Sequence, residues 1–353
     1  MNKNILKSLD INDNTILSDL KDEDIKKVIE SLDNYCLRLR NSIGNFPDDT
    51  VGFEFEFEDY DENAIKKEMI KNNYFEEGYK LYPDGHDCQN NYFPYVYEVC
   101  TPILNLHNIN WNRIKDLCYI LKRNSTIGNN CGAHIHVGVQ VLNNKIDSLT
   151  NFVGMIIAYE NIIARFLYGN FINERMSMHT YATLVAKDWY DEYILFDKNY
   201  YKKYSINSII NILSDYYSKN KFINLSNVYK LGKEEVNNTI EFRGANGTLD
   251  PIIWQNNCNM IIKLMKYCNS TNFDKEKIDN RIEKKYSYLN NYKYYRSIDI
   301  KGAIELCDLI FTNNIDKIYF LRQYLKDRKY TDSKILVLSK KFTETKYNDN
   351  DIV

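Results

Sequence analysis

Residues Val51 to Glu58 read VGFEFEFE, and this stretch decides the fold. Three phenylalanines alternate with three glutamates, which predicts a half-buried strand with one apolar and one polar face. A polar face that is simply solvated usually mixes both signs of charge, yet Glu54, Glu56 and Glu58 have no cation between them. A row of carboxylates suits a divalent cation, because hard cations take oxygen ligands. A solvated strand face and a metal site are therefore the two interpretations of this stretch.

The composition is that of an ordinary globular protein. The 353 residues are 44% hydrophobic and 27% charged, enough for one large or two modest domains. The net charge of -2 gives no basic excess that would indicate nucleic acid or an anionic membrane as a partner. We expect neither a membrane span nor a signal peptide. The eight cysteines are scattered without a CxxC pair, which predicts a cytoplasmic protein with mostly buried free thiols.

The apolar pattern along the chain predicts an α+β protein. Helices are expected over 18–43, with Ser18 as N-cap, and over 61–72, 111–124, 147–167 and 250–267, with further helical patterns over 173–235 and after 274. Strands are expected over 51–58, within 79–97, and over 98–102, 130–141 and 237–242. No Pro/Gly/Ser-rich linker divides the chain, so we predict one catalytic domain over 49–268 with helical extensions over 1–48 and 269–353.

The segment CGAHIHVG, residues 131–138, is the second informative stretch. His134 and His136 stand two residues apart, so on a strand they share one face. The chain has only five histidines, and two of them lie here. Such a strand can bind a metal or a phosphate; the alternative is a pair of hydrogen-bonded polar residues in the sheet. We expect Cys131, which opens the segment, to be a small packed residue.

Three further motifs carry charge. In TIEFRG, Glu241 and Arg243 point to the same side, either as a surface ion pair or as a metal ligand beside a phosphate-binding arginine. Glu98 in YVYEVCTP is costly to bury unpaired, so it lies on an edge or pairs with a cation. Asp84 in PDG is foremost a turn residue. Together these strands predict one polar sheet face able to hold two or more divalent cations and a polyphosphate.

The order of these motifs resembles the amidoligase family, part of the carboxylate–amine ligase superfamily that includes glutamine synthetase and glutamate–cysteine ligase. The matching pieces are GFEFE (52–56), PDG (83–85), EVCTP (98–102), CGAHIHVG (131–138) and TIEFRGANGTLD (239–250). The ordered set is specific, whereas no single piece is. One departure is His86, because many members have a small residue after the DG of the turn.

The resemblance implies a glutamine synthetase-like fold, in which an antiparallel sheet curves around a funnel for ATP and Mg²⁺ or Mn²⁺ and helices pack outside. The implied metal ligands are Glu54, Glu56, Glu98, His134 and Glu241. The resemblance also implies that His136 lies near the ATP phosphates and that Arg243 binds phosphate. Arg175 and Tyr181 match the arginine and tyrosine that follow the long helix in many members. The implied catalytic residues are Arg243, Glu241 and Arg175.

The implied activity is ATP-dependent formation of an amide or isopeptide bond through an acyl phosphate. The substrate is open: an amino acid, a small peptide, or a side chain of a protein or ribosomally made peptide. Glutamate rather than thiolate ligands favour Mg²⁺ or Mn²⁺ over Zn²⁺. The alternatives are a metal-dependent hydrolase that uses the HxH strand, a non-catalytic nucleotide- or peptide-binding protein, and a tyrosine-rich interaction protein. The sequence lacks a GxxxxGKS loop, which argues against a P-loop kinase.

Overall fold

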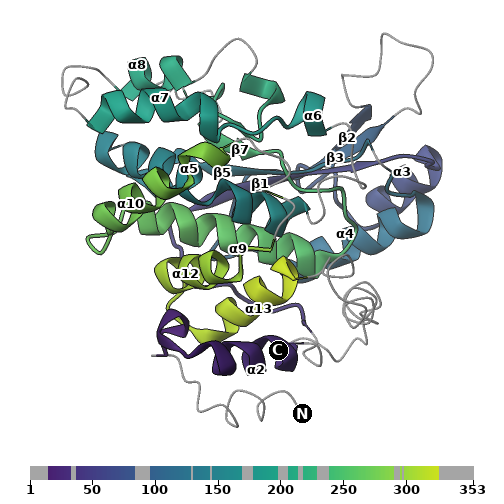
Figure 1. Cartoon of the computed structure of the whole chain (residues 1–353). Coiled ribbons are helices and arrows are strands. Elements are labelled where there is room, and N and C mark those ends of the chain that lie inside the picture. The colour runs from purple at the N-terminus through teal and green to yellow at the C-terminus, as the bar shows by residue number, and fades with distance from the viewer. Residues whose placement is uncertain are drawn as a thin grey trace.

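A computed structural model describes residues 15–32, 37–83, 96–128, 130–143, 145–168, 178–197, 206–213, 218–228, 238–289, 295 and 298–325. Helices and an open antiparallel sheet combine in it, which confirms the predicted α+β class (Figure 1). The strands are β1 (Thr50–Phe57), β2 (Lys80–Pro83), β3 (Tyr97–Cys100), β4 (Leu104–Asn105), β5 (Ala133–Gly138), β6 (Ile223–Asn224) and β7 (Thr239–Phe242).

Strand β1 lies at the centre of the sheet, whose order is β2-β3-β1-β5-β7-β6, with β4 paired to the start of β1. All pairings between these strands are antiparallel. The alternation in β1 separates two faces, because successive side chains of a strand point to opposite sides. Phe53 and Phe55 are buried on one face, where their rings lie 5.4 and 4.2 Å from the ring of Trp254. The opposite face carries the glutamates.

Helices beneath the sheet cover its apolar face in layers, whereas α6, α7 and α8 lie above the level of the sheet (Figure 1). The helices of the described chain are α2 (Asp22–Leu32), α3 (Glu62–Lys71), α4 (Trp111–Asn124), α5 (Ile146–Tyr168), α6 (Met178–Tyr181), α7 (Ala186–Asp197), α8 (Ile206–Leu213), α9 (Pro251–Cys268), α10 (Lys275–Lys285), α12 (Ile300–Ile310) and α13 (Asn314–Tyr324). The short 3₁₀ helices are η1 (Leu17–Asp19), η2 (Val139–Leu142), η4 (Ser218–Asn220) and η6 (Tyr286–Tyr288). Helix α9 packs under the sheet, and α12 and α13 pack under α9. None of the described helices combines the length and the apolar character that crossing a membrane requires.

The helix predicted over 18–43 is confirmed only in part, as α2 (Asp22–Leu32). Ser18 lies inside η1 rather than at a cap, α2 ends at Leu32, and residues 37–49 form no helix. Helix α9 supplies the hydrogen bonds of this irregular segment: Arg40 N–H donates to Gln255 Oε1 at 2.8 Å, and Gln255 Nε2 donates to the Arg40 carbonyl at 2.6 Å. A buried side chain therefore replaces the intrahelical bonds of this segment, an arrangement that apolar periodicity does not report.

Most of the other predicted helices and strands are confirmed. The helices expected over 61–72, 111–124, 147–167 and 250–267 are confirmed as α3, α4, α5 and α9, and the strands around 51–58, 98–102 and 237–242 as β1, β3 and β7. The strand expected over 130–141 is shorter, because η2 follows β5. The predicted turn at Pro83 to Gly85 lies mostly outside the described residues.

The segments on either side of the predicted catalytic domain pack against each other and against α5 and α9. Asp308 on α12 accepts hydrogen bonds from the backbone N–H groups of Leu17 and Ser18, at 3.0 and 2.7 Å. On α13, the Phe320 ring stacks on Phe166 of α5, with ring centroids 4.6 Å apart. The boundaries at 48/49 and 268/269 stay predictions.

Helix α5 carries a buried carboxylate, Glu160. Its Oε1 accepts hydrogen bonds from the backbone N–H groups of Val185 and Ala186, at 2.6 and 3.0 Å, where α7 begins. Its Oε2 accepts a hydrogen bond from the Tyr295 hydroxyl at 2.7 Å. Burial raises the pKa of Glu160 to about 7, although these three hydrogen bonds oppose the shift. Glu160 thus fixes the start of α7 to α5.

This raised pKa predicts a pH-dependent contribution to stability. A carboxyl group that titrates near 7 when folded and near 4.5 when unfolded stabilises the protonated folded state, and this stability is lost as the pH rises through 7. Glu160→Gln cannot titrate at this position. Between pH 4.5 and 7.5 the free energy of unfolding of the wild type should therefore fall by about 3 kcal/mol relative to that of the variant. Denaturant unfolding at both pH values measures the difference. Glu283→Gln, at an exposed position of α10, is the control. A difference between Glu160→Gln and the wild type that is the same at both pH values would contradict the assignment.

Candidate active site

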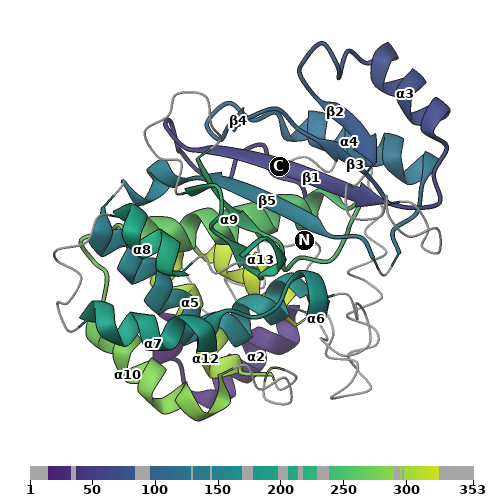
Figure 2. The ribbon, with the colours of Figure 1, turned by 90° about the horizontal axis from the view of Figure 1, so that it is seen from above.

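The face of the sheet that points away from α9 collects the charged side chains predicted from the sequence. Seen from above in Figure 2, β1 and β5 on this face lie uncovered by the labelled helices. The strand registers pair Glu54 with His134 and Cys100, Glu56 with Glu98, and His136 with Glu241. Directly paired residues share a face, as do residues two apart along a strand, so all of these side chains belong to one surface. We name it the polar sheet face.

Glu54 connects the two histidines of β5. Its Oε2 lies 2.9 Å from His134 Nδ1, and its Oε1 lies 2.8 Å from His136 Nε2. Burial alone would raise the pKa of Glu54, but the hydrogen bonds and charges of both histidines outweigh it and hold that pKa well below its usual range. Burial would lower the pKa of His136, yet Glu54 and the charge of Glu241 raise it overall. This cluster therefore favours an ionised carboxylate beside imidazolium or a cation.

His134 lies between further carboxylates and is itself buried. Its Nε2 is 3.2 Å from Glu56 Oε1, and its Nδ1 is 3.6 Å from Glu241 Oε1. Glu56 is directly opposite Glu98, and the two residues are 4% and 8% exposed. Two carboxylates that face each other across a strand pair repel unless a cation lies with them. The β1–β3 side of the polar sheet face thus has the character of a cation site.

Glu241 and Arg243 form the β7 end of the polar sheet face. Glu241 Oε1 is 2.5 Å from Arg243 Nη1, and its Oε2 accepts a hydrogen bond from Asn224 Nδ2 at 2.6 Å. Arg243 Nε donates to the carbonyl oxygen of Tyr181 at 3.5 Å, so α6 ends beside this arginine. Sequence reasoning missed Asn224, because the two-residue strand β6 has no periodic signal; only its pairing with Glu241 identifies it.

Most of the predicted site residues come together here. The polar sheet face or its β7 end contains Glu54, Glu56, Glu98, His134, His136, Glu241, Arg243 and Tyr181. Arg175, Asp84 and His86 lie outside the described residues. Glu58, the last carboxylate of the VGFEFEFE stretch, is buried: its side chain lies against Gly128, where a Cβ atom would be 0.9 Å from Oε1.

A divalent cation fits this set of side chains. Glu54, His136 and Glu241 each offer a ligand atom, and these atoms lie within 4.8 Å of one another. Divalent cations bind carboxylate oxygens and imidazole nitrogens at about 2.0–2.6 Å, so one ion can reach all three. Among the described residues, four carboxylates meet the Arg243 guanidinium, the Lys80 ammonium and two imidazoles, so the face is negative while the histidines are neutral. The Nε2 of His134, which forms no hydrogen bond within the described chain, is a further available ligand atom.

Loss of one carboxylate should therefore weaken cation binding. We expect the purified protein to bind Mn²⁺, and Glu54→Gln or Glu241→Gln to weaken this binding at least tenfold, since an amide is a poorer ligand than a carboxylate. Titration calorimetry with Mn²⁺ measures the affinity. Because a cation that binds only the folded state stabilises it, chelation should lower the melting temperature of the wild type and leave both variants nearly unchanged. Glu283→Gln is the matched control; equal Mn²⁺ affinity in all four proteins would refute the site.

Comparison with known proteins agrees with this geometry. A family model described as "Putative amidoligase enzyme" matches residues 47–265, which is more than half of the 353 residues. The matched range contains every strand of the sheet and every side chain of the polar sheet face. No curated protein matches the sequence. The resemblance inferred from the ordered motifs is confirmed, and the chain belongs to the amidoligase family.

Proposed function

We propose that this protein is an ATP-dependent carboxylate–amine ligase that forms an amide or isopeptide bond, with Mg²⁺ or Mn²⁺ on the polar sheet face. The observation that carries the proposal is the pair Glu241 and Arg243. The carboxylate lies among the candidate metal ligands, and the guanidinium is 2.5 Å from it. A metal-bound polyphosphate needs both groups at one place: oxygen ligands for the cation and a guanidinium for the phosphate oxygens.

The reaction chemistry explains why such a site is useful. A carboxylate does not condense with an amine unaided, because its oxygen is a poor leaving group. In the proposed reaction a substrate carboxylate oxygen attacks the γ-phosphorus of ATP and ADP leaves. The amine nitrogen then attacks the acyl carbon, inorganic phosphate leaves, and the amine loses a proton. Phosphoryl transfer of this kind is catalysed mainly by positioning and by neutralising charge.

The proposed roles follow from the positions of the side chains. Glu54, His136 and Glu241 would hold one cation, and Glu56, Glu98 and His134 would hold a second, as the negative charge on both sides of β1 supports. A cation held there would act as a Lewis acid and neutralise the negative charge of the phosphate groups. This extends the sequence-based prediction, which gave His134 to the metal and His136 to the phosphates.

Arg243 would bind phosphate directly. Two of its nitrogens donate to Glu241 and to the Tyr181 carbonyl, while its third nitrogen, Nη2, has no acceptor within the described chain. Burial disfavours its charge, but Glu241 and the neighbouring carboxylates raise its pKa, so it stays positive. Arg175 is proposed as a second catalytic cation and Tyr181 as a nucleotide contact on the family resemblance alone. The same resemblance leads us to propose that the open sheet curves into a glutamine synthetase-like funnel.

For the two substrates and the cellular compartment of the protein we propose only general classes. The carboxylate and the amine would come from an amino acid, a peptide, or a side chain of a protein or ribosomally made peptide. The six cysteines in the described ranges are free and five of them are buried, as suits a reducing compartment such as the cytoplasm. A metal-dependent hydrolase is less favoured, because the ligand set is dominated by carboxylates rather than by the histidines and thiolates that select zinc.

ATP turnover tests the proposal. The purified protein with Mg²⁺ or Mn²⁺, pools of amino acids and a cell extract should release ADP and phosphate, and mass spectrometry should find a product lighter than its two substrates by one water. Arg243→Ala and Glu241→Gln should each lower turnover about 100-fold or more, since both remove charge neutralisation of the transferring phosphoryl group. Lys122→Ala, at an exposed position of α4, is the control. Turnover that survives both site variants would disprove the assignment of β7.

A further inference from the structure

The short strand β6 places a buried amide, that of Asn224, beside Glu241 of the polar sheet face. The strand register pairs the two residues directly, and each is 4% exposed. Asn224 Nδ2 donates a hydrogen bond to Glu241 Oε2 at 2.6 Å. The Ser226 backbone N–H donates to Asn224 Oδ1 at 2.9 Å, which turns the N–H groups of the amide toward the carboxylate. Asn224 is thus a hydrogen-bond donor with a fixed direction.

Packing holds β6 in place, although this strand has only two residues. Ile223 and Leu225, on either side of Asn224, are both buried in the core. The Phe222 ring lies against Gly244, where a Cβ atom would be 1.7 Å from the ring. A side chain whose surroundings are packed in this way can hold a neighbouring group in one position. The amide of Asn224 is therefore in place before any ligand binds.

The two carboxylate oxygens of Glu241 have different neighbours. Among the described residues, Oε2 has one hydrogen-bond partner, the amide of Asn224. Oε1 instead lies 3.6 Å from His134 Nδ1, 3.9 Å from His136 Nε2 and 2.5 Å from Arg243 Nη1. By holding Oε2, the amide directs Oε1 to the place where the candidate cation ligands meet.

Arg243 is a competitor for the same carboxylate. A guanidinium and a carboxylate frequently pair through two parallel hydrogen bonds, which use both oxygens. Such a pair would neutralise Glu241 and leave its oxygens less available to a cation. While Asn224 occupies Oε2, Arg243 pairs with Oε1 alone. The amide is neutral, so it holds the carboxylate without adding a positive charge that would repel the cation.

We propose that Asn224 is a positioning residue of the cation site: it keeps Glu241 Oε1 available to the cation by preventing Arg243 from binding both oxygens of Glu241. This inference rests on the cation site proposed for the polar sheet face. It adds to that site an uncharged residue from a strand that contributes no candidate ligand. Groups that hydrogen-bond a metal ligand orient it, and their loss typically lowers metal affinity about 10- to 100-fold.

Titration calorimetry of the full chain with Mn²⁺, without nucleotide, tests the inference. Asn224→Ala should weaken Mn²⁺ binding at least tenfold, at the same site that Glu241→Gln weakens. The matched control is Asn259→Ala on α9, which also removes a buried amide donor: Asn259 Nδ2 donates to Asp316 Oδ1 at 2.7 Å, away from the polar sheet face. This control should bind Mn²⁺ like the wild type.

A double-mutant cycle with Arg243→Ala tests the role given to Asn224. If the amide acts by limiting how Arg243 pairs with Glu241, its removal matters only while the guanidinium is present. Asn224→Ala should then lower the Mn²⁺ affinity at least tenfold in the wild-type background, and by less than about threefold in the Arg243→Ala background. A merely structural contribution of Asn224 would lower the affinity by the same factor in both backgrounds.

The outcomes separate this inference from the proposals on which it rests. A wild type that does not bind Mn²⁺ would refute the cation site, and the inference with it. Weak binding by Glu241→Gln together with wild-type affinity in Asn224→Ala, or equal losses in both backgrounds of the cycle, would overturn the inference alone. Because ATP is absent, failure of the ligase proposal by itself would not change these results. Thermal unfolding checks that each variant folds; Asn224→Ser, whose hydroxyl is too short to hold Oε2, replaces an Asn224→Ala variant that does not.

Discussion

The negative charge gathered on one side of the sheet is the feature that the rest of the structure must stabilise. Carboxylates brought out of water and close together oppose folding, and ion pairs recover only part of that cost. The opposite face supplies the compensating stability, because the phenylalanines of β1 pack on Trp254 of α9 and further helices pack beneath. Strict alternation in β1 is what couples the two: each apolar side chain in the core fixes the position of a carboxylate on the other side. A cation on that face would then act on stability and chemistry together.

Much of this could be predicted from the sequence, because a period of two is a strong signal. The alternation of VGFEFEFE, the HxH pair and the EFR triplet each identified a strand and the side chains on its polar face. Register, however, depends on contacts between distant segments, so only the structure shows that Glu56 faces Glu98 and that Asn224 binds Glu241. The segment around Arg40 was missed for a similar reason: side chains of α9 and α13, rather than its own helical turns, supply its hydrogen bonds.

The polar sheet face depends on a support that lies outside the sheet. Residues that follow α6 pair with the segment before β6: Thr183 N–H donates to the Asn220 carbonyl at 2.9 Å, and Phe222 N–H donates to the Thr183 carbonyl at 2.8 Å. Phe222 in turn accepts a hydrogen bond from Arg243 N–H at 3.0 Å. Glu160 holds the far end of the same segment, where α7 begins. A continuous set of hydrogen bonds therefore connects a buried carboxylate of α5 to the backbone of the arginine proposed to bind phosphate.

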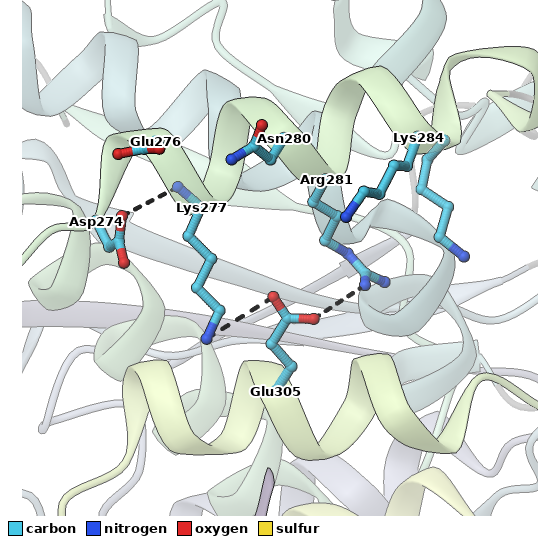
Figure 3. Close-up of a pocket in the computed structure, with 8 residues that line it drawn as sticks. Asp274, Glu276, Lys277, Asn280, Arg281, Lys284 and Glu305 are labelled. Atoms are coloured by element: carbon cyan, nitrogen blue, oxygen red, sulfur yellow. Dashed lines mark hydrogen bonds and ion pairs between the residues drawn. The ribbon is translucent and has the colours of Figure 1, made fainter. Parts of the chain in front are cut away.

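Charge is arranged differently on the sheet and between the helices, for a physical reason. Strands place side chains at fixed pairs across a sheet, so carboxylates from three strands can converge on one cation. A helix instead repeats side chains along one face, so Lys277 and Arg281 of α10 both form ion pairs with Glu305 of α12 (Figure 3). Gly302 on α12 lets the Arg281 guanidinium approach closely, since a Cβ atom there would lie 2.5 Å from Nη2. The contact between α10 and α12 thus joins charges of opposite sign, whereas the polar sheet face brings charges of the same sign together.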